Sequence, residues 1–80
     1  MNEYLIKLQA SFLDIKDEIE KAKGKYPKDF NSLHEAYAVI LEEFDELWDE
    51  IKKKNVDKEK VREEAIQVGA MISRLLVELL

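Results

Sequence analysis

The chain has 80 residues, no cysteine, and a formal net charge of −5. This length fits one domain over residues 1–80, and the lack of cysteine excludes disulfides and thiolate metal sites. The acidic balance argues against binding nucleic acid, which usually requires a basic surface. The apolar runs are far too short to span a membrane, and no signal-peptide pattern precedes the first amphipathic segment. We therefore expect a cytoplasmic protein that binds neither nucleic acid nor membranes.

The apolar residues recur at helical spacing in three segments, which predicts an all-α fold with helices at about residues 3–22, 33–54 and 58–80. Gly24 and Pro27 indicate the end of the first helix. Ser32 and Glu35 have the spacing of a capping box, which predicts the start of the second. Asp57 is a favourable N-cap for the third.

The third segment is apolar over more than half of its circumference. One seam consists of Val61, Ala65, Val68, Ile72, Leu75 and Leu79, and a second seam consists of Ile66, Ala70, Ser73, Val77 and Leu80. We expect that two shorter helices of the same chain cannot cover both seams, so the second seam packs against another copy. A chain that lacks a fourth helix would have the same surface. The expected fold is a three-helix chain that forms a multi-chain helical bundle, as a dimer or a tetramer.

An acidic cluster lies in the second segment, where six of the nine residues at 42–50 are Asp or Glu. Helical geometry places Glu43 and Glu46 at the edge of the core, and Glu64 and Gln67 at the corresponding edge of the third segment. Antiparallel packing would bring these four side chains together. Carboxylates on facing helices bind hard cations such as Mg²⁺, which can orient a triphosphate and activate a water.

The cluster also has an ordinary structural explanation. An acidic run on a helix is commonly a solvated face, and Glu64 has Lys60 one turn earlier as an ion-pair partner. That explanation does not account for the like-charged i,i+4 pairs that Glu46 makes with Glu42 and Glu50. Each such pair costs ~0.2–0.5 kcal/mol, and a bound cation would relieve the repulsion.

Arg74 is the candidate for binding the phosphates of a nucleotide. It lies on the same side of the third segment as Gln67, and a guanidinium suits a phosphate. It is equally well placed to pair with Glu78, one turn later. The sequence leaves both roles open.

The spacing of the acids resembles that of the MazG-like group of all-α nucleoside triphosphate pyrophosphohydrolases. Residues 41–47 resemble its Glu-Glu-x-x-Glu motif, and residues 62–68 resemble its Glu-x-x-Asp motif, within a match over residues 33–80. The resemblance implies Mg²⁺-dependent cleavage of a nucleoside triphosphate to a monophosphate and pyrophosphate by a dimer or tetramer. Glu43, Glu46 and Glu64 would be the catalytic metal ligands, with Gln67 as a weaker ligand.

Gln67 departs from this family pattern, because it stands where the family usually has aspartate. An amide offers one neutral oxygen to a metal and cannot act as a base, so we expect weaker metal binding. The second function that the sequence leaves open is a non-catalytic helical module for oligomerisation or partner binding. In that case the acids are a solvated face, and the second seam of the third helix makes the contact.

Overall fold

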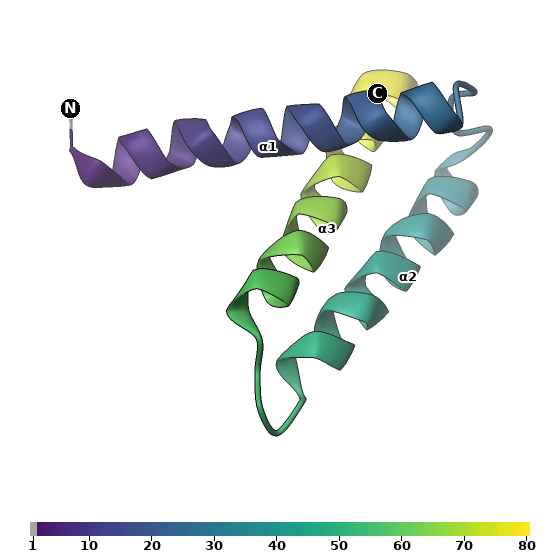
Figure 1. The fold of residues 1–80 in the computed structure, drawn as a ribbon. Helices are drawn as coiled ribbons and strands as arrows, with labels where there is room; N and C mark the ends of the chain where they lie inside the picture. The colour runs from purple at the N-terminus through teal and green to yellow at the C-terminus, as the bar shows by residue number, and fades with distance from the viewer. Residues whose placement is uncertain (1) are drawn as a thin grey trace.

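The computed structural model describes residues 2–80, and over that range it contains three α-helices and no strand. α1 spans Glu3–Lys25, α2 spans Leu33–Ile51, and α3 spans Lys58–Leu79. α2 and α3 form an antiparallel hairpin, and α1 crosses α3 and extends beyond the hairpin at its N-terminal end (Figure 1). Both α1 and α2 pack on α3, which is therefore the central helix. Each of these helices is too polar or too short to cross a membrane.

Local capping determines where α2 and α3 begin, as the sequence predicts. The Ser32 hydroxyl accepts a hydrogen bond from the Glu35 backbone N–H at 3.0 Å. Glu35 reaches back by one residue more than in the standard capping box, since its carboxylate accepts from the Asn31 backbone N–H at 3.0 Å. Asp57 caps α3 by accepting from the Glu59 backbone N–H at 3.0 Å. These side chains satisfy backbone donors that have no partner within the helix.

The helix ends differ from the predicted ones. α1 continues through Gly24 to Lys25, because Gly24 does not adopt the positive φ of a C-cap glycine. Tyr26, the residue before Pro27, has non-helical backbone angles (φ −130°, ψ 82°), and it ends the helix. α2 ends at Ile51 and not at residue 54, and the lysines at 52–54 belong to the turn that leads to α3.

The core of the single chain is thin. Its buried hydrophobic residues are Phe30, Ala36, Ile40, Val68, Ala70 and Met71. Among residues 2–80, no large side chain is completely buried, and two of the six core residues are alanines. Large apolar side chains remain exposed on the surface, among them Tyr37 at 67 % and Leu76 at 59 %. The single chain therefore leaves much of its apolar surface uncovered.

The prediction that α1 and α2 cannot cover both seams of α3 is wrong for the middle of the helix. α1 crosses α3 where Ile15 lies against Gly69, and a Cβ added to Gly69 would be 2.9 Å from the Ile15 Cδ1. Because a glycine has no side chain at this crossing, the two backbones approach closely. Ala70, in the second seam, is completely buried. Only the end of that seam, with Val77 at 83 % exposure, remains uncovered.

Candidate metal centre

Three glutamates from two helices converge at the edge of the α2–α3 pair. Glu43 and Glu46 lie one turn apart on α2, and Glu64 faces them from α3. One carboxylate oxygen of each lies within 4.8 Å of the others. Glu43 and Glu64 are half-buried, whereas Glu46 is exposed. The structure therefore brings together three of the four residues that the sequence places in the site.

The cluster is electrostatically strained in the absence of a cation. Burial, together with the negative charge of Glu46, raises the pKa of Glu43 to about 7. Burial and the charge of Glu46 also raise the pKa of Glu64. Oε2 of Glu43 and Oε2 of Glu64 are buried and have no hydrogen-bond partner among residues 2–80. A buried carboxylate oxygen without a partner is destabilising, so this cluster favours a proton or a cation.

The donor set fits a hard divalent cation. Three carboxylates offer only oxygen ligands, which Mg²⁺ prefers, and Mg²⁺ usually retains several waters in such a site. A proton or a cation would satisfy the two buried oxygens that have no partner. Within the part of the chain that the structure describes, the ion pairs do not include one between Lys60 and Glu64. The ion pair with Lys60, which would explain Glu64 as part of a solvated helix face, is therefore not observed.

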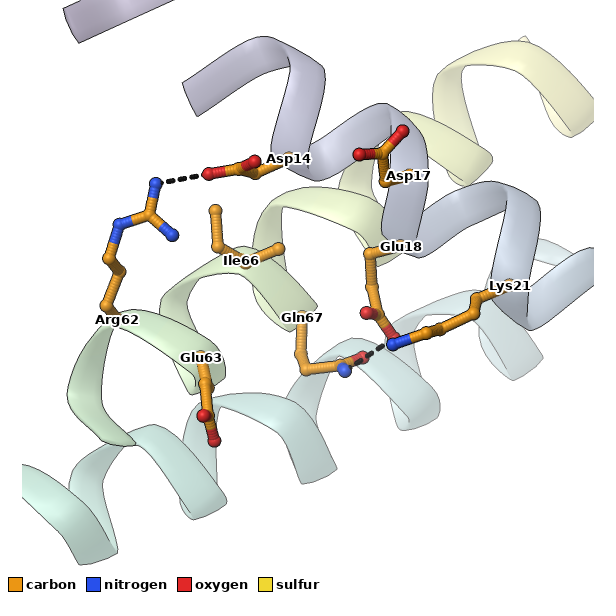
Figure 2. A pocket seen from close by; sticks show the side chains of 8 residues that line it. All are labelled: Asp14, Asp17, Glu18, Lys21, Arg62, Glu63, Ile66 and Gln67. Atoms are coloured by element: carbon orange, nitrogen blue, oxygen red, sulfur yellow. Dashed lines mark hydrogen bonds and ion pairs between the residues drawn. The ribbon is translucent and has the colours of Figure 1, made fainter. Parts of the chain in front are cut away.

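Gln67 is held by a residue of α1. Its Nε2 donates a hydrogen bond to the Glu18 Oε1 at 2.6 Å (Figure 2). The amide oxygen of Gln67 therefore points away from Glu18, since the nitrogen is used in that contact. The sequence pattern does not single out Glu18. The only signal for it is its position beside the Ile15–Ile19 stripe that packs on α3.

Two cavities flank Gln67. The first lies between α1 and the N-terminal half of α3, has a volume of ≈ 500 Å³, and is crossed by an ion pair between Arg62 and Asp14 (Figure 2). The second lies among all three helices, has a volume of ≈ 520 Å³, and includes Glu43 in its wall. Glu43 is therefore shared by the second cavity and the glutamate cluster, whereas Glu46 and Glu64 do not line that cavity.

Arg74 takes the ion-pair role that the sequence leaves open. It is 8 % exposed, and its Nε donates to the Glu78 Oε2 at 2.7 Å. Its Nη2 donates to the Lys28 carbonyl at 3.3 Å, and its guanidinium lies 4.3 Å from the centre of the Phe30 ring. Because these contacts connect the α1–α2 segment to α3, Arg74 has a structural role, and its predicted contact with a phosphate stays a prediction.

Glu78 is the acceptor at the centre of this network. It also accepts a hydrogen bond from the Phe30 backbone N–H at 2.8 Å. The hydrogen bond from Arg74, and then that from Phe30, lower the pKa of Glu78 to about 2. This buried carboxylate is thus fully satisfied, in contrast to those of Glu43 and Glu64.

No family model, curated protein or solved structure matches this chain. A function for the protein must therefore be argued from the resemblance of its motifs and from the geometry of the glutamate cluster. That geometry distinguishes the cluster from an ordinary acidic helix face, because two of its oxygens are buried without partners.

Proposed function

We propose that the protein is a Mg²⁺-dependent, MazG-like hydrolase that cleaves nucleoside triphosphates to a monophosphate and pyrophosphate. The observation that carries this proposal is the convergence of Glu43, Glu46 and Glu64 within 4.8 Å, where one oxygen of Glu43 and one of Glu64 are buried without a partner. The spacing of the acidic residues resembles that of the MazG-like group, and this resemblance suggests the reaction class. The three carboxylates suggest Mg²⁺ as the metal. The proposed location is the cytoplasm.

The three glutamates hold the metal in this proposal. When bound, Mg²⁺ would neutralise the phosphates and lower the pKa of an attacking water. Glu43 and Glu46 present ligands from successive turns of α2, and Glu64 completes the set from α3. Gln67, fixed by Glu18, orients a water through its amide oxygen but does not accept a proton from it. In this proposal the three glutamates are the metal ligands, and Gln67 is a weaker fourth position.

Proton release accompanies metal binding at this centre. With a pKa of about 7, Glu43 is partly protonated at neutral pH, and the proton must leave before the oxygen binds a metal. The affinity for Mg²⁺ should therefore rise as the pH increases through 7. A site made of exposed carboxylates with ordinary pKa values would show no such dependence in this range.

We further propose that the chain works as a dimer or tetramer through a multi-chain helical bundle. The surface that supports this is the outer apolar face, which consists of Tyr37, Leu41, Phe44 and Trp48 on α2 and Ile72 and Leu76 on α3. All six residues are exposed, at 38–67 %. The face is built from two adjacent antiparallel helices, and a second copy of the same pair would convert it into the core of a four-helix bundle.

Helical geometry places these residues on one side of the hairpin. Successive residues turn by about 100°, so Tyr37 and Trp48 lie about a quarter turn from Ile40, which packs toward α3. On α3, Leu76 lies about a quarter turn from Leu75, which packs toward α2. The two helices run in opposite directions (Figure 1). By helical geometry, residues offset by equal angles in the same sense from the contact line therefore lie on the same side of the hairpin. The glutamate cluster is offset in the other sense, so assembly through this face leaves it accessible.

The test of the metal proposal is Glu46→Gln, with Asp45→Asn as a control that removes the same charge from an exposed position of α2. Isothermal titration with Mg²⁺ should show binding to the wild type and to Asp45→Asn, and no binding to Glu46→Gln. Circular dichroism should show unchanged helix content in both variants. Release of pyrophosphate, screened over all ribo- and deoxyribonucleoside triphosphates, should follow Mg²⁺ binding. Equal Mg²⁺ binding by the two variants would refute the assignment.

The second candidate function is a non-catalytic module for oligomerisation or partner binding, and the outer apolar face favours it. Light scattering on Trp48→Glu, with the exposed Tyr4→Glu on α1 as a control, tests the role of this face. We expect an oligomer for the wild type and Tyr4→Glu, and a monomer for Trp48→Glu. An oligomer that neither binds Mg²⁺ nor releases pyrophosphate would favour the second function over the first.

A further inference from the structure

The cavity among the three helices combines an apolar wall with two lysines. We name it the α1 cavity; the residues of its wall that matter here are Lys21, Lys25, Tyr26, Val39, Glu43 and Met71. Its volume of ≈ 520 Å³ is within the range of small-molecule sites in proteins. Val39 and the buried Met71 form its apolar part. The chemistry of the wall suits a ligand that has both an apolar or planar part and an anionic part.

Lys21 and Lys25 give the α1 cavity positive charge, and the acids Glu18 and Glu43 also line it. The two lysines lie one turn apart on α1, so both project from the same side of the helix. Over residues 2–80, the ion pairs of the structure involve neither of them. Lys23 on the same helix is different, because its ammonium lies 2.6 Å from Asp29 and 3.5 Å from Glu78. The side chain of Lys21 extends toward those of Glu18 and Gln67 (Figure 2).

Aromatic and apolar groups lie beside these charges. Tyr26 is 64 % exposed, and the Lys25 ammonium lies 5.5 Å from the centre of its ring. An exposed tyrosine at the end of a helix, next to a cavity, offers a face on which a planar ring can stack. Met71 forms an adaptable apolar surface on the α3 side of the cavity.

We infer that the α1 cavity binds the nucleotide, with Lys21 and Lys25 as a metal-independent subsite for its phosphates and Tyr26 as the contact for its base. The identity of the ligand rests on the proposed function. Glu43 belongs to both the cavity wall and the glutamate cluster, so a phosphate chain between the lysines and Glu43 would also reach the metal centre. α1, which carries none of the acidic motif, is thereby assigned a role in substrate affinity.

The experiment is a titration followed by ¹⁵N NMR in EDTA, with tripolyphosphate and a non-hydrolysable nucleoside triphosphate as two separate probes. The double variant Lys21→Gln/Lys25→Gln is compared with Lys16→Gln, which removes one charge of α1 from an exposed pair with Glu20. We expect the double variant to weaken both probes by about fivefold for each lysine, and Lys16→Gln to change neither by more than about twofold. Tyr26→Ala should weaken the nucleotide but not tripolyphosphate.

The outcomes separate this inference from the proposed function. No binding to the wild type in EDTA, or equal weakening by the double variant and Lys16→Gln, would overturn the inference. In either case the proposed function would still stand if Glu46→Gln abolishes Mg²⁺ binding and pyrophosphate release. If the lysine and tyrosine variants behave as expected while Mg²⁺ does not bind, the cavity holds a nucleotide without the proposed hydrolysis.

Discussion

Replacing Glu43 with glutamine should make the metal-free protein more stable at pH 8 while abolishing its response to Mg²⁺. Glutamine has nearly the same shape but no charge, so it removes the cost of burying a charged carboxylate and the repulsion from Glu46 and Glu64. The shift in pKa from 4.5 to about 7 sets the size of the effect. One pKa unit corresponds to ~1.4 kcal/mol, which gives an upper limit of ~3 kcal/mol. Because Glu43 is only half-buried, solvent screening reduces the expected gain to ~1 kcal/mol.

The pH dependence follows from the direction of the shift. The folded protein raises the pKa of Glu43, so it binds the proton more tightly than the unfolded chain does. The destabilisation is absent below pH 4.5, develops as the pH rises toward 7, and is complete above 7. The advantage of Glu43→Gln over the wild type should therefore be near zero at pH 4.5 and largest at pH 8.

Thermal melts followed by circular dichroism measure this directly. At pH 8 without metal, the melting temperature of Glu43→Gln should exceed that of the wild type by about 4–8 °C, as expected for ~1 kcal/mol in a domain of this size. Adding Mg²⁺ should raise the melting temperature of the wild type only. Asp45→Asn is the charge-matched control and should show neither effect. A gain at pH 8 that is equal in the two variants, or a Mg²⁺ response retained by Glu43→Gln, would refute the reasoning.

Two further predictions concern stability. Glu78→Gln leaves Arg74 buried without its counter-charge and should destabilise the protein by about 3 kcal/mol at pH 7 in urea unfolding. Because the pKa of Glu78 is lowered to about 2, its contribution is complete above pH 4.5 and is lost as the pH falls toward 2, so the difference from the wild type should shrink over that range. Gly24→Ala should stabilise α1 by about 0.5–1 kcal/mol, since an added Cβ meets nothing within 4 Å. Gly69→Ala should gain less in thermal melts, because its Cβ would meet Ile15 at 2.9 Å; equal gains would contradict this account.

The sequence predicted the helices and the glutamate cluster because both depend on local patterns. Ser32 and Asp57 cap α2 and α3 through residues two or three positions away. The convergence of Glu43, Glu46 and Glu64 also needed little tertiary information. Two amphipathic helices joined by a short turn pack antiparallel, which brings residues that flank the two seams close together. Gln67 is the exception, because it is held by Glu18 of α1.

The end of α1 was predicted less well, because the residues near it are compatible with more than one position of the helix end. Gly24 can lie inside a helix or serve as its C-cap. Which of the two conformations it adopts depends on whether the chain needs a residue with positive φ at that point. Here Pro27 ends the helix through Tyr26, so Gly24 remains helical.

The resemblance to a known family added a reaction class, which the helical pattern alone does not contain.

The sequence by itself determined that the chain is helical, where α2 and α3 begin, and which glutamates face one another across them. Only the tertiary structure decided the position of α1, which covers the middle of the second seam of α3 and brings Glu18 to Gln67 across 49 positions of sequence. It also decided that Arg74 is buried with Glu78, and that Lys21 and Lys25 line a cavity. The physical reason is that helical periodicity defines which face of a helix is apolar, but not which partner covers it. That choice depends on close packing at Gly69 and on contacts between distant residues, which have no local signature.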